Sequence, residues 1–232
     1  MRLFRRGPAL GRTQRGAPQD DLFFRRKSHG NQNPAGGPHR HQLLLLCDTG
    51  AGVCAVIDPG AEASRVAAAV QESGCTPCAI LLTHGHYDHT GAVAQLRQMW
   101  PQVPVYLSRK DQYDAGTYAA ELFPAIPGAV DYGEGDKIAV GNLTVEVLST
   151  PGHSEGGRTL RCGDVLFCGD TLFAGSCGRT DFVGGSMTTL MDSLARLGRL
   201  TGNYRVLPGH MEPSDLDTER RTNPYLIQAM RK

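Results

Sequence analysis

Residues Ile80–Gly91 read I-L-L-T-H-G-H-Y-D-H-T-G, and this stretch decides the fold because it joins an apolar run to a loop of metal-binding side chains. The apolar run Ala79–Leu82 follows Thr76-Pro77, a boundary that predicts a short buried β-strand. His84-Gly85-His86 then leaves the C-terminal end of that strand, which is where open α/β sheets bind their ligands. The stretch therefore predicts a binding site at a strand end.

Four side chains of this loop are of metal-ligand type: His84, His86, Asp88 and His89. Imidazole suits zinc, iron, copper or nickel, and a neighbouring carboxylate suits a Lewis-acidic divalent ion. His84 and His86 lie two positions apart on an extended loop and can share one ion. Asp88 and His89 follow half a turn later and point elsewhere, so they suit a second ion nearby. A single surface histidine is usually just solvated, but so dense a group behind a buried strand is not explained that way.

The same arrangement of short apolar strand, sharp turn and metal-binding residue occurs three more times. Val145–Ser149 leads to His153, Val165–Cys168 leads to Asp170, and Val206–Leu207 leads to His210. Each of these residues alone is as readily structural as functional. If the four strands end at one edge, their residues come together with the first cluster. We therefore expect one site built from four strand ends.

The remaining pattern alternates short strands with helices. Strands are predicted at 43–46, 53–57, 103–107, 137–140, 143–149, 165–168 and 205–207, and helices at 61–73, 92–99, 110–122, 187–200 and 219–230. The segment Arg158–Cys162, which follows His153, is polar for a core strand. We expect Asp58-Pro-Gly60 to end the strand that precedes the first helix.

The N-terminal segment differs in composition from the rest. Residues 1–40 carry nine Lys/Arg and two Asp, with six Gly, four Pro and no period of 2 or 3.6. Such a composition does not bury enough apolar surface to offset the entropy of ordering the chain. Transit peptides are rich in Ser, and this segment has a single Ser. We expect residues 1–41 to be a disordered basic tail and residues 42–232 to form one folded domain.

Composition restricts the partners and the compartment. Residues 41–232 carry 15 Lys/Arg against 21 Asp/Glu, and this mildly acidic body gives no support to nucleic-acid binding. No apolar run approaches the 18 residues of a membrane span. Seven widely spaced cysteines, with no secretory signal, favour free thiols in the cytoplasm. The lone C-x-x-C at Cys75–Cys78 is a weak zinc signal, and we expect incidental thiols there.

The motifs together resemble the metallo-β-lactamase-fold hydrolases. The resemblance rests on T-H-G-H-Y-D-H at 83–89, P-G-H at 151–153, G-D at 169–170 and P-G-H at 208–210, and covers residues 42–226. It implies an α/β protein with an αββα sandwich, two mixed sheets flanked by helices. It also implies two metal sites: His84, His86 and His153 on the first ion, Asp88, His89 and His210 on the second, with Asp170 bridging. The resemblance gives Asp88 and Asp170 the catalytic role and makes Asp58 an outer-shell carboxylate.

The chemistry of such a site can be argued from its parts. Two divalent ions about 3.5–4 Å apart hold a water whose pKa falls toward about 7, and the resulting hydroxide attacks an acyl carbon. A thiol leaving group has a pKa near 8.5, about the level at which it departs without a general acid. The sequence has no G-x-S-x-G nucleophile motif. We therefore expect a small-molecule thioester substrate and two Zn²⁺ per chain, with Fe or Mn as other candidates.

The C-terminal motif indicates one branch within this family. L-P-G-H-M-E-P-S and E-R-R-T-N-P-Y-L, within Leu207–Leu226, resemble the short, single-domain glyoxalase II-like hydrolases. Only 22 residues follow His210, so we expect no C-terminal helical domain for glutathione. Glu212 stands where two-domain members have tyrosine, and Arg179 and Asp181 stand near the positions of their lysine and tyrosine. The thiol carrier and the acyl group are left open.

Two other functions remain. Gly175–Phe182, read as G-S-C-G-R-T-D-F, resembles a loop of the persulfide dioxygenases, whose single iron would use His84, His153 and Asp170. The same loop occurs in the short hydrolases, where Arg179 is structural. A β-lactamase is disfavoured because Asp170 stands where those enzymes have cysteine or serine. A non-catalytic metal-binding scaffold is the other alternative, and it would be supported by the loss of a ligand.

Overall fold

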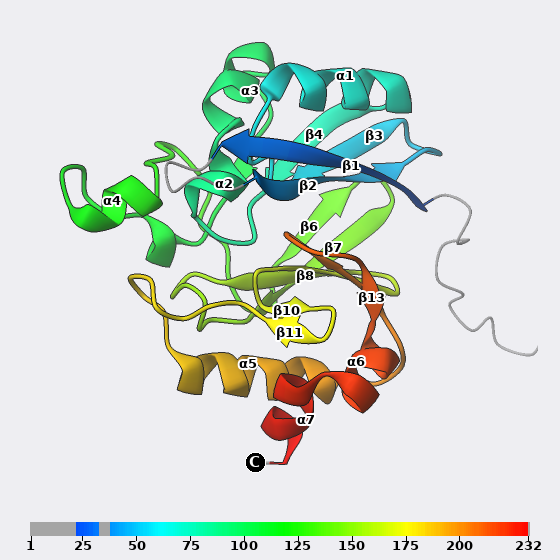
Figure 1. The fold of residues 1–232 in the computed structure, drawn as a ribbon. Helices are drawn as coiled ribbons and strands as arrows, with labels where there is room; N and C mark the ends of the chain where they lie inside the picture. The colour runs from blue at the N-terminus through cyan, green and yellow to red at the C-terminus, as the bar shows by residue number, and fades with distance from the viewer. Residues whose placement is uncertain (1–21, 33–37, 232) are drawn as a thin grey trace, which may run out of the picture.

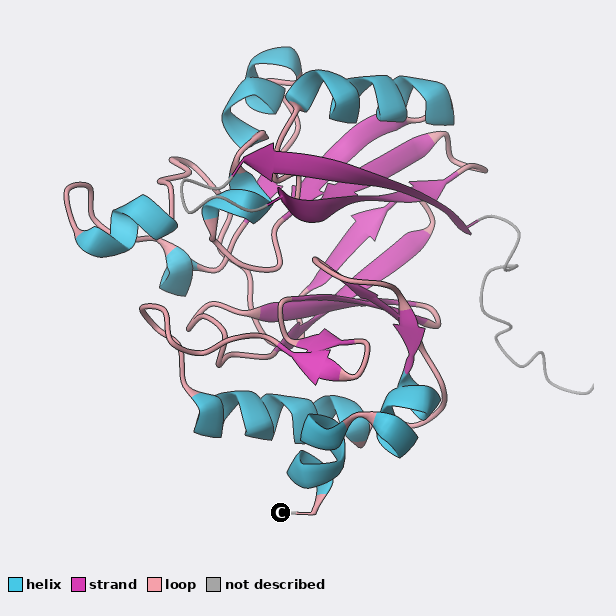
Figure 2. Cartoon of the chain, in the orientation of Figure 1, coloured by secondary structure: helices cyan, strands magenta, loops and turns pink. Residues whose placement is uncertain are grey.

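Two β-sheets stack face to face, and helices cover the outer face of each sheet (Figures 1 and 2). The computed structural model describes residues 22–32 and 38–231, and side chains from residue 43 onward. The predicted αββα sandwich is thereby confirmed. No helix in the described part of the chain has both the length and the apolar character needed to cross a membrane.

The first sheet is mixed. Its strands in spatial order are β1 (Leu22–Gln32), β2 (Pro38–Asp48), β3 (Val53–Ile57), β4 (Thr76–Leu81) and β5 (Val105–Tyr106). β1, β2 and β3 pair antiparallel, and β3, β4 and β5 pair parallel. β3 shows why the buried strands have unbroken apolar runs. Cys54 and Val56 pack toward the helices, whereas Ala55 and Ile57 pack toward the second sheet, so both faces are dry.

The second sheet has the order β13 (Ser214–Asp215), β12 (Arg205–Pro208), β9 (Val165–Gly169), β8 (Arg158–Cys162), β7 (Leu143–Ser149) and β6 (Lys137–Val140). β12 runs parallel to β9, and β8 runs antiparallel to both β9 and β7. β7, β9 and β12 therefore point the same way and end at the same edge. A separate ribbon pairs β10 (Leu172–Phe173) with β11 (Ser176–Cys177).

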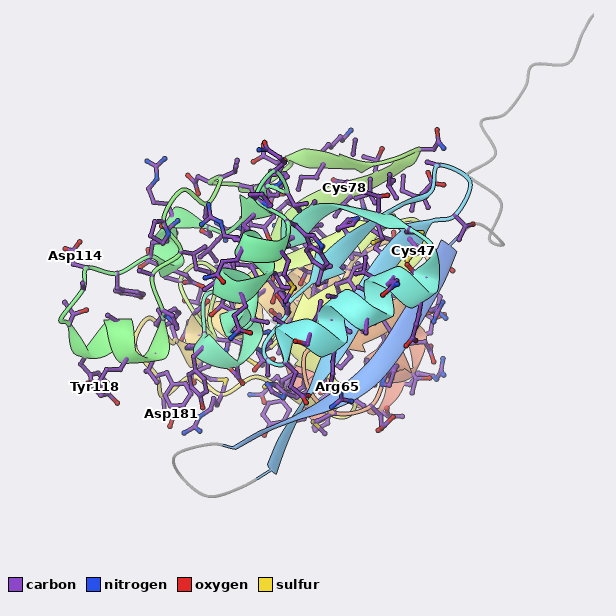
Figure 3. All side chains as sticks on the ribbon, turned by 90° about the horizontal axis from the view of Figure 1, so that it is seen from above. Cys47, Arg65, Cys78, Asp114, Tyr118 and Asp181 are labelled. Atoms are coloured by element: carbon purple, nitrogen blue, oxygen red, sulfur yellow. The ribbon has the colours of Figure 1, made fainter. Side chains whose placement is uncertain are left out.

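Helices close the sandwich on both sides. α1 (Ala63–Ser73) and α3 (Val93–Met99) cover the first sheet, and α5 (Met187–Gly198), α6 (Leu216–Thr222) and α7 (Pro224–Met230) lie against the second (Figure 1). Three apolar layers result, one between the sheets and one under each helical layer. Short elements surround the strand ends: α2 (Tyr87–Thr90), the 3₁₀ turn η2 (Arg109–Asp111) and α4 (Tyr118–Leu122). Seen from above, α4 with Tyr118 projects at the end of the molecule opposite Cys47 (Figure 3).

The N-terminal prediction is wrong for part of its length. Residues 22–32 form β1, and β2 begins at Pro38 instead of near residue 43, as two strands paired along their whole length. A β-ladder bonds through the backbone, so an added strand needs no apolar periodicity of its own. The remainder of the predicted tail, residues 1–21 and 33–37, lies outside the described residues.

Two helix predictions are corrected as well. The helix expected over 110–122 is only η2 and α4, because Gly116 has a positive φ of 85° and Thr117 begins a new helix by capping the Ala120 N–H. The expected helix over 219–230 is two helices, α6 and α7. Asn223-Pro224 separates them, with Asn223 capping α7 and Pro224 in its first turn.

Candidate metal centre

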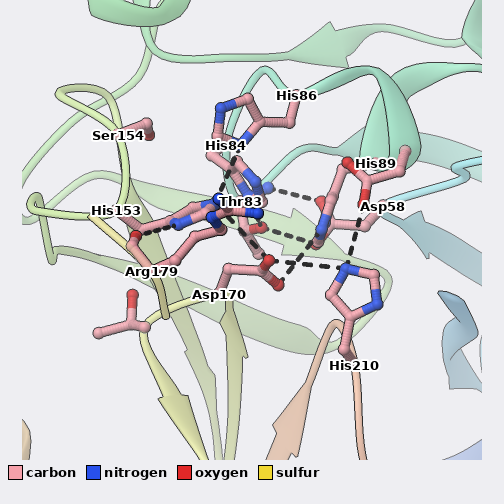
Figure 4. Close-up of polar contacts among 12 residues, drawn as sticks. Asp58, Thr83, His84, His86, His89, His153, Ser154, Asp170, Arg179 and His210 are labelled. Atoms are coloured by element: carbon pink, nitrogen blue, oxygen red, sulfur yellow. Dashed lines mark hydrogen bonds and ion pairs between the residues drawn. The ribbon is translucent and has the colours of Figure 1, made fainter. Parts of the chain in front are cut away.

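Four strand ends deliver the seven predicted ligands to one place (Figure 4). His84 and His86 follow β4, and Asp88 and His89 lie on α2. His153 follows β7, Asp170 comes directly after β9, and His210 follows β12. The expected meeting of these strand ends is thus what the structure has. Binding of metal by the seven residues stays a prediction.

The first group consists of His84, His86 and His153, and we call it the inner triad. One ring nitrogen from each can be chosen so that all three lie within 4.8 Å of one another. His86 Nδ1 and His153 Nε2 are 2.9 Å apart. All three side chains are buried, with 2% of His84 and 4% of His86 exposed. These are three buried imidazole donors facing a common point, the arrangement of a transition-metal site.

The second group consists of Asp88, His89 and His210, and we call it the outer triad. Its ligand atoms also lie within 4.8 Å of one another, and His210 Nε2 is 3.1 Å from Asp88 Oδ2. His89 is fully buried, but the side chains of Asp88 and His210 are 21% and 17% exposed. The outer triad thus contains one carboxylate and lies on the more exposed side of the centre.

Asp170 lies between the two triads. Its Oδ2 is 3.6 Å from Nε2 of His153 in the inner triad and 3.5 Å from Nε2 of His210 in the outer triad. Its Oδ1 is 3.3 Å from Nε2 of His89. A carboxylate within reach of both triads is what a bridging ligand requires, which agrees with the role implied by the family resemblance.

Asp58 supports one histidine from each triad (Figure 4). Its Oδ2 accepts a hydrogen bond from His89 Nδ1 at 3.0 Å and another from Thr83 Oγ1 at 2.6 Å. Thr83 Oγ1 in turn lies 3.1 Å from His84 Nδ1. Because the Thr83 hydroxyl donates to Asp58, it accepts from His84. His84 is thereby held with Nδ1 protonated and Nε2 turned toward the centre as a lone pair, and His89 with its Nδ1–H on Asp58 and its Nε2 turned toward the centre.

His153 is fixed in the same manner by a backbone carbonyl. His153 Nδ1 donates to the carbonyl oxygen of Arg179 at 2.7 Å. The Arg179 side chain itself forms an ion pair with Asp181 and lies over the Phe182 ring at 4.1 Å. The Arg179 guanidinium therefore makes contacts within its own loop, to Asp181 and Phe182, whereas the Arg179 backbone oxygen accepts the hydrogen bond from His153.

Two glycines allow the close approach of the strand ends. A Cβ on Gly209 would lie 2.4 Å from Cε1 of His89 and 2.8 Å from Oδ1 of Asp170. A Cβ on Gly169 would lie 2.2 Å from Thr83 Oγ1, and Gly169 has a positive φ of 48°. Sequence reasoning quoted both glycines as motif letters and missed that the site has no room for a side chain there.

The triads differ in how they hold protons. Burial, followed by the charge of neighbouring histidines, places the pKa of His84 well below its usual value and that of His86 at about 3. In His89 and His210 burial also opposes the proton, but Asp170 overcomes it, aided by Asp58 and Asp88 respectively, so both pKa values are raised. Burial would raise the pKa of Asp170, yet His89 and His210 hold it well below the usual range. His84 and His86 are therefore neutral, whereas His89 and His210 hold protons beside carboxylates.

The residues fit divalent metal. His84 Nε2 is buried and has no hydrogen-bond partner among the described residues, although its Nδ1 is satisfied. A buried lone pair without a donor is costly unless a cation takes that place. Three imidazoles in one triad, and an imidazole pair with a carboxylate in the other, are ligand sets of zinc and of iron.

Aromatic rings line one side of the inner triad. The His86 ring lies 4.3 Å from the Phe123 ring and 5.6 Å from the Phe182 ring, and Phe123 contacts Tyr113. Phe123 is fully buried. No spacing signal in the sequence indicated these rings, because they come from separate loops. They exclude water from one wall of the centre.

Comparison with known proteins identifies relatives over most of the chain. The sequence profile described as Metallo-beta-lactamase superfamily matches residues 37–210. A protein of Bacillus subtilis named "Probable metallo-hydrolase YqgX" is 37% identical over 204 residues, 83% of this chain and 95% of that protein. "Hydroxyacylglutathione hydrolase GloC" of Haemophilus influenzae is 33% identical over 197 residues, 74% of this chain and 86% of that protein.

A solved structure resembles this one closely. The crystal structure of TTHA1623 in a di-iron-bound form superposes with a TM-score of 0.70 at 35% identity, covering 85% of this chain and 99% of that chain. The similarity thus extends from sequence to three-dimensional arrangement.

Proposed function

Because this chain belongs to the metallo-beta-lactamase superfamily, we propose that it is a metal-dependent hydrolase that cleaves the thioester of a small molecule. The observation that carries the proposal is the position of Asp170 between two complete triads, within 3.6 Å of a histidine of each. One relative is named a hydroxyacylglutathione hydrolase, which supports a hydroxyacyl thioester of glutathione as the first substrate to test.

Two divalent ions bound by the triads would supply a water of lowered pKa and polarise the acyl carbonyl. The protein's own contribution is to hold the ligands in place before substrate arrives. The Nδ1 atoms of His84, His89 and His153 are each satisfied by a fixed acceptor, so their Nε2 atoms face the centre. A thiol with a pKa near about 8.5 leaves without a general acid, so the substrate class makes few further demands on the side chains.

Zinc is the proposed metal, with two ions per chain. Zinc has no geometric preference and accepts both ligand sets. Iron is the alternative, supported by the di-iron form of the related TTHA1623. We propose a reducing location, the cytoplasm, because the seven cysteines are all free thiols. The proposed substrate is a small molecule, with no role for nucleic acid.

One experiment tests the proposal. The purified protein is analysed for metal and assayed with S-lactoylglutathione, and oxygen uptake is measured in parallel with glutathione persulfide. We expect two equivalents of metal, thioester cleavage and no oxygen uptake. Asp170→Ala should remove the activity. Oxygen uptake with a single iron would instead identify a dioxygenase using His84, His153 and Asp170, and a metal-loaded protein inactive in both assays would support the non-catalytic scaffold.

A further inference from the structure

A buried carboxylate that is not among the predicted ligands contacts both loops that carry the inner triad. Asp111 ends the 3₁₀ turn η2, which follows the first sheet's edge strand β5. Its side chain is 1% exposed. It comes 22 residues after His89 in the sequence and belongs to none of the motifs described above. A charged side chain at such depth requires several hydrogen bonds to be tolerated.

Both oxygens of Asp111 are occupied by donors from the two loops of the inner triad. Oδ2 accepts from the Gly85 N–H at 3.0 Å and from Ser154 Oγ at 2.7 Å, and Oδ1 accepts from the Gly156 N–H at 2.6 Å. Gly85 stands between His84 and His86, and Ser154 is the residue after His153. One carboxylate therefore ties together the loops that carry all three histidines.

The approach is close enough to require glycine in both loops. A Cβ on Gly85 would lie 2.8 Å from the Asp111 carbonyl oxygen and 2.9 Å from its Cβ. A Cβ on Gly156 would lie 2.4 Å from Asp111 Cγ. Neither clash can be relieved by moving the end of a flexible side chain, because the atoms belong to the backbone or to the fixed carboxyl group.

We infer that Asp111 is a positioning residue of the inner metal site, which sets the distance between the His84–His86 loop and the His153 loop. The inference rests on metal binding by the inner triad, not on the thioester reaction of the proposed function. Outer partners that orient metal ligands change metal affinity about 10- to 100-fold when they are removed. A shift in loop separation also alters the geometry around the ion, and this has a spectroscopic signature.

The test compares Asp111→Asn with a control acid at the other end of the sandwich. Asp48 is also buried and also accepts backbone N–H bonds, from Ala51 at 2.9 Å and Asn142 at 2.6 Å, but it lies at the far end of β2 from the site. In each variant an amide donor replaces one accepting oxygen. Metal-free full-length protein is titrated with Co²⁺, following the visible d–d absorption and the dissociation constant of each equivalent.

We expect Asp111→Asn to bind the inner Co²⁺ about 10- to 100-fold more weakly with a changed d–d spectrum, whereas Asp48→Asn keeps the wild-type affinity and spectrum. Ser154→Ala removes one donor and leaves the carboxylate, so it serves if Asp111→Asn does not fold. It should shift the spectrum in the same direction by a smaller amount.

Three outcomes would overturn the inference. In the first, Asp111→Asn, or Ser154→Ala in its place, lowers only the melting temperature of the metal-free protein and leaves Co²⁺ affinity and spectrum unchanged. In the second, Asp48→Asn changes the spectrum equally. In the third, the wild-type protein binds no Co²⁺, and the inner triad is then not a metal site that Asp111 could position. Failure of the thioester assay alone, with Co²⁺ bound as expected, rejects the proposed function and leaves Asp111 as inferred.

Discussion

The inner and outer triads share one centre but are built in opposite ways. The inner triad has three imidazoles, with the Phe123 ring against His86, and the pKa values of His84 and His86 are lowered, that of His86 to about 3. The outer triad has an exposed edge and a carboxylate of its own, and its two histidines have raised pKa values. The contrast teaches that burial alone does not set the charge of a histidine. The fully buried His89 keeps its proton because Asp58 and Asp170 contact it.

Metal binding should therefore proceed differently in the two triads. A metal ion that enters the inner triad displaces no proton from His84 or His86, because the pKa values of both are lowered. An ion that enters the outer triad must displace protons from His89 and His210. Asp88 and Asp170, whose carboxylates contact those histidines, are themselves predicted ligands of the metal. The experiments that follow probe this difference, beginning with the residue that both triads share.

Asp170→Ala should have the largest effect, because Asp170 contacts both triads. We expect the loss in kcat/KM to exceed the roughly 100-fold typical of outer partners, together with weaker binding of both ions. Thioester turnover and metal content of the dialysed variant are the measurements. Asp136→Ala, at an exposed turn that belongs to neither triad, is the control. Retained turnover in Asp170→Ala would refute its placement at the centre of the reaction.

His86→Ala and His210→Ala should each remove one ion, and the ions should differ. We expect the metal content to fall from two equivalents to about one in both variants. The remaining ion should bind with the weaker pH dependence in His210→Ala, because it occupies the inner triad, where His84 and His86 carry no proton to displace. In His86→Ala it should bind more tightly as the pH rises. If metal affinity changed with pH in the same way in both variants, the inferred difference in protonation between the triads would be wrong.

Asp58→Asn should weaken both sites unequally. Asp58 contacts His89 directly at 3.0 Å but reaches His84 only through the Thr83 hydroxyl. We expect about 10- to 100-fold weaker binding at the outer triad and a smaller loss at the inner triad. Stepwise Co²⁺ dissociation constants measure both effects. Equal losses at the two sites would mean that Asp58 acts on the loop as a whole and not through His89.

The pH dependence of the wild-type protein follows from the directions of the pKa shifts. The pKa values of His89 and His210 are raised, so below them metal competes with protons at the outer triad, and affinity there should rise about tenfold per pH unit for each proton displaced. Near pH 7 His84 and His86 should release no proton to the metal, because both pKa values are lowered, that of His86 to about 3. Calorimetry in two buffers of different ionisation enthalpy counts the protons released, and the absence of proton release when the outer triad is filled would contradict the assignment.

Sequence reasoning predicted the αββα fold and the position of the ligands because both depend on local patterns. Apolar runs ending in a turn and a histidine are visible within a few residues, and the family motif spans seven. Partners distant in sequence were not predictable. Asp111 acts on residues 26 and 43 positions away, and β1 is ordered by the neighbouring backbone.

The strand β8 shows the same limit in a segment whose burial, not its contacts, was difficult to predict from sequence. Arg158–Cys162 looked too polar for the core, yet Arg158 and Thr159 are buried. Most of their polar atoms have hydrogen-bond partners: Thr159 Oγ1 pairs with Thr150, and the two terminal nitrogens of the Arg158 guanidinium donate to Ser108 Oγ and to the Gly157 carbonyl. Hydropathy along the chain records a side chain's cost of burial but not the partners that offset it.

Thr83→Val should have the smallest effect on metal affinity of these substitutions, and it should affect the inner triad without affecting the outer triad. It removes the hydroxyl between Asp58 and His84 while the Thr83 N–H still donates to Asp58 Oδ1 at 2.7 Å. The freed Asp58 Oδ2 keeps its bond to His89, so the outer triad retains its support. We expect inner-site Co²⁺ affinity to fall by no more than about tenfold, the lower end for an outer partner, with the outer-site affinity unchanged. Thr90→Val, whose hydroxyl bonds only to the His86 carbonyl among the described residues, is the matched control. A larger loss at the outer site than at the inner site would show that the triads are coupled through Thr83, and their separate treatment would then fail.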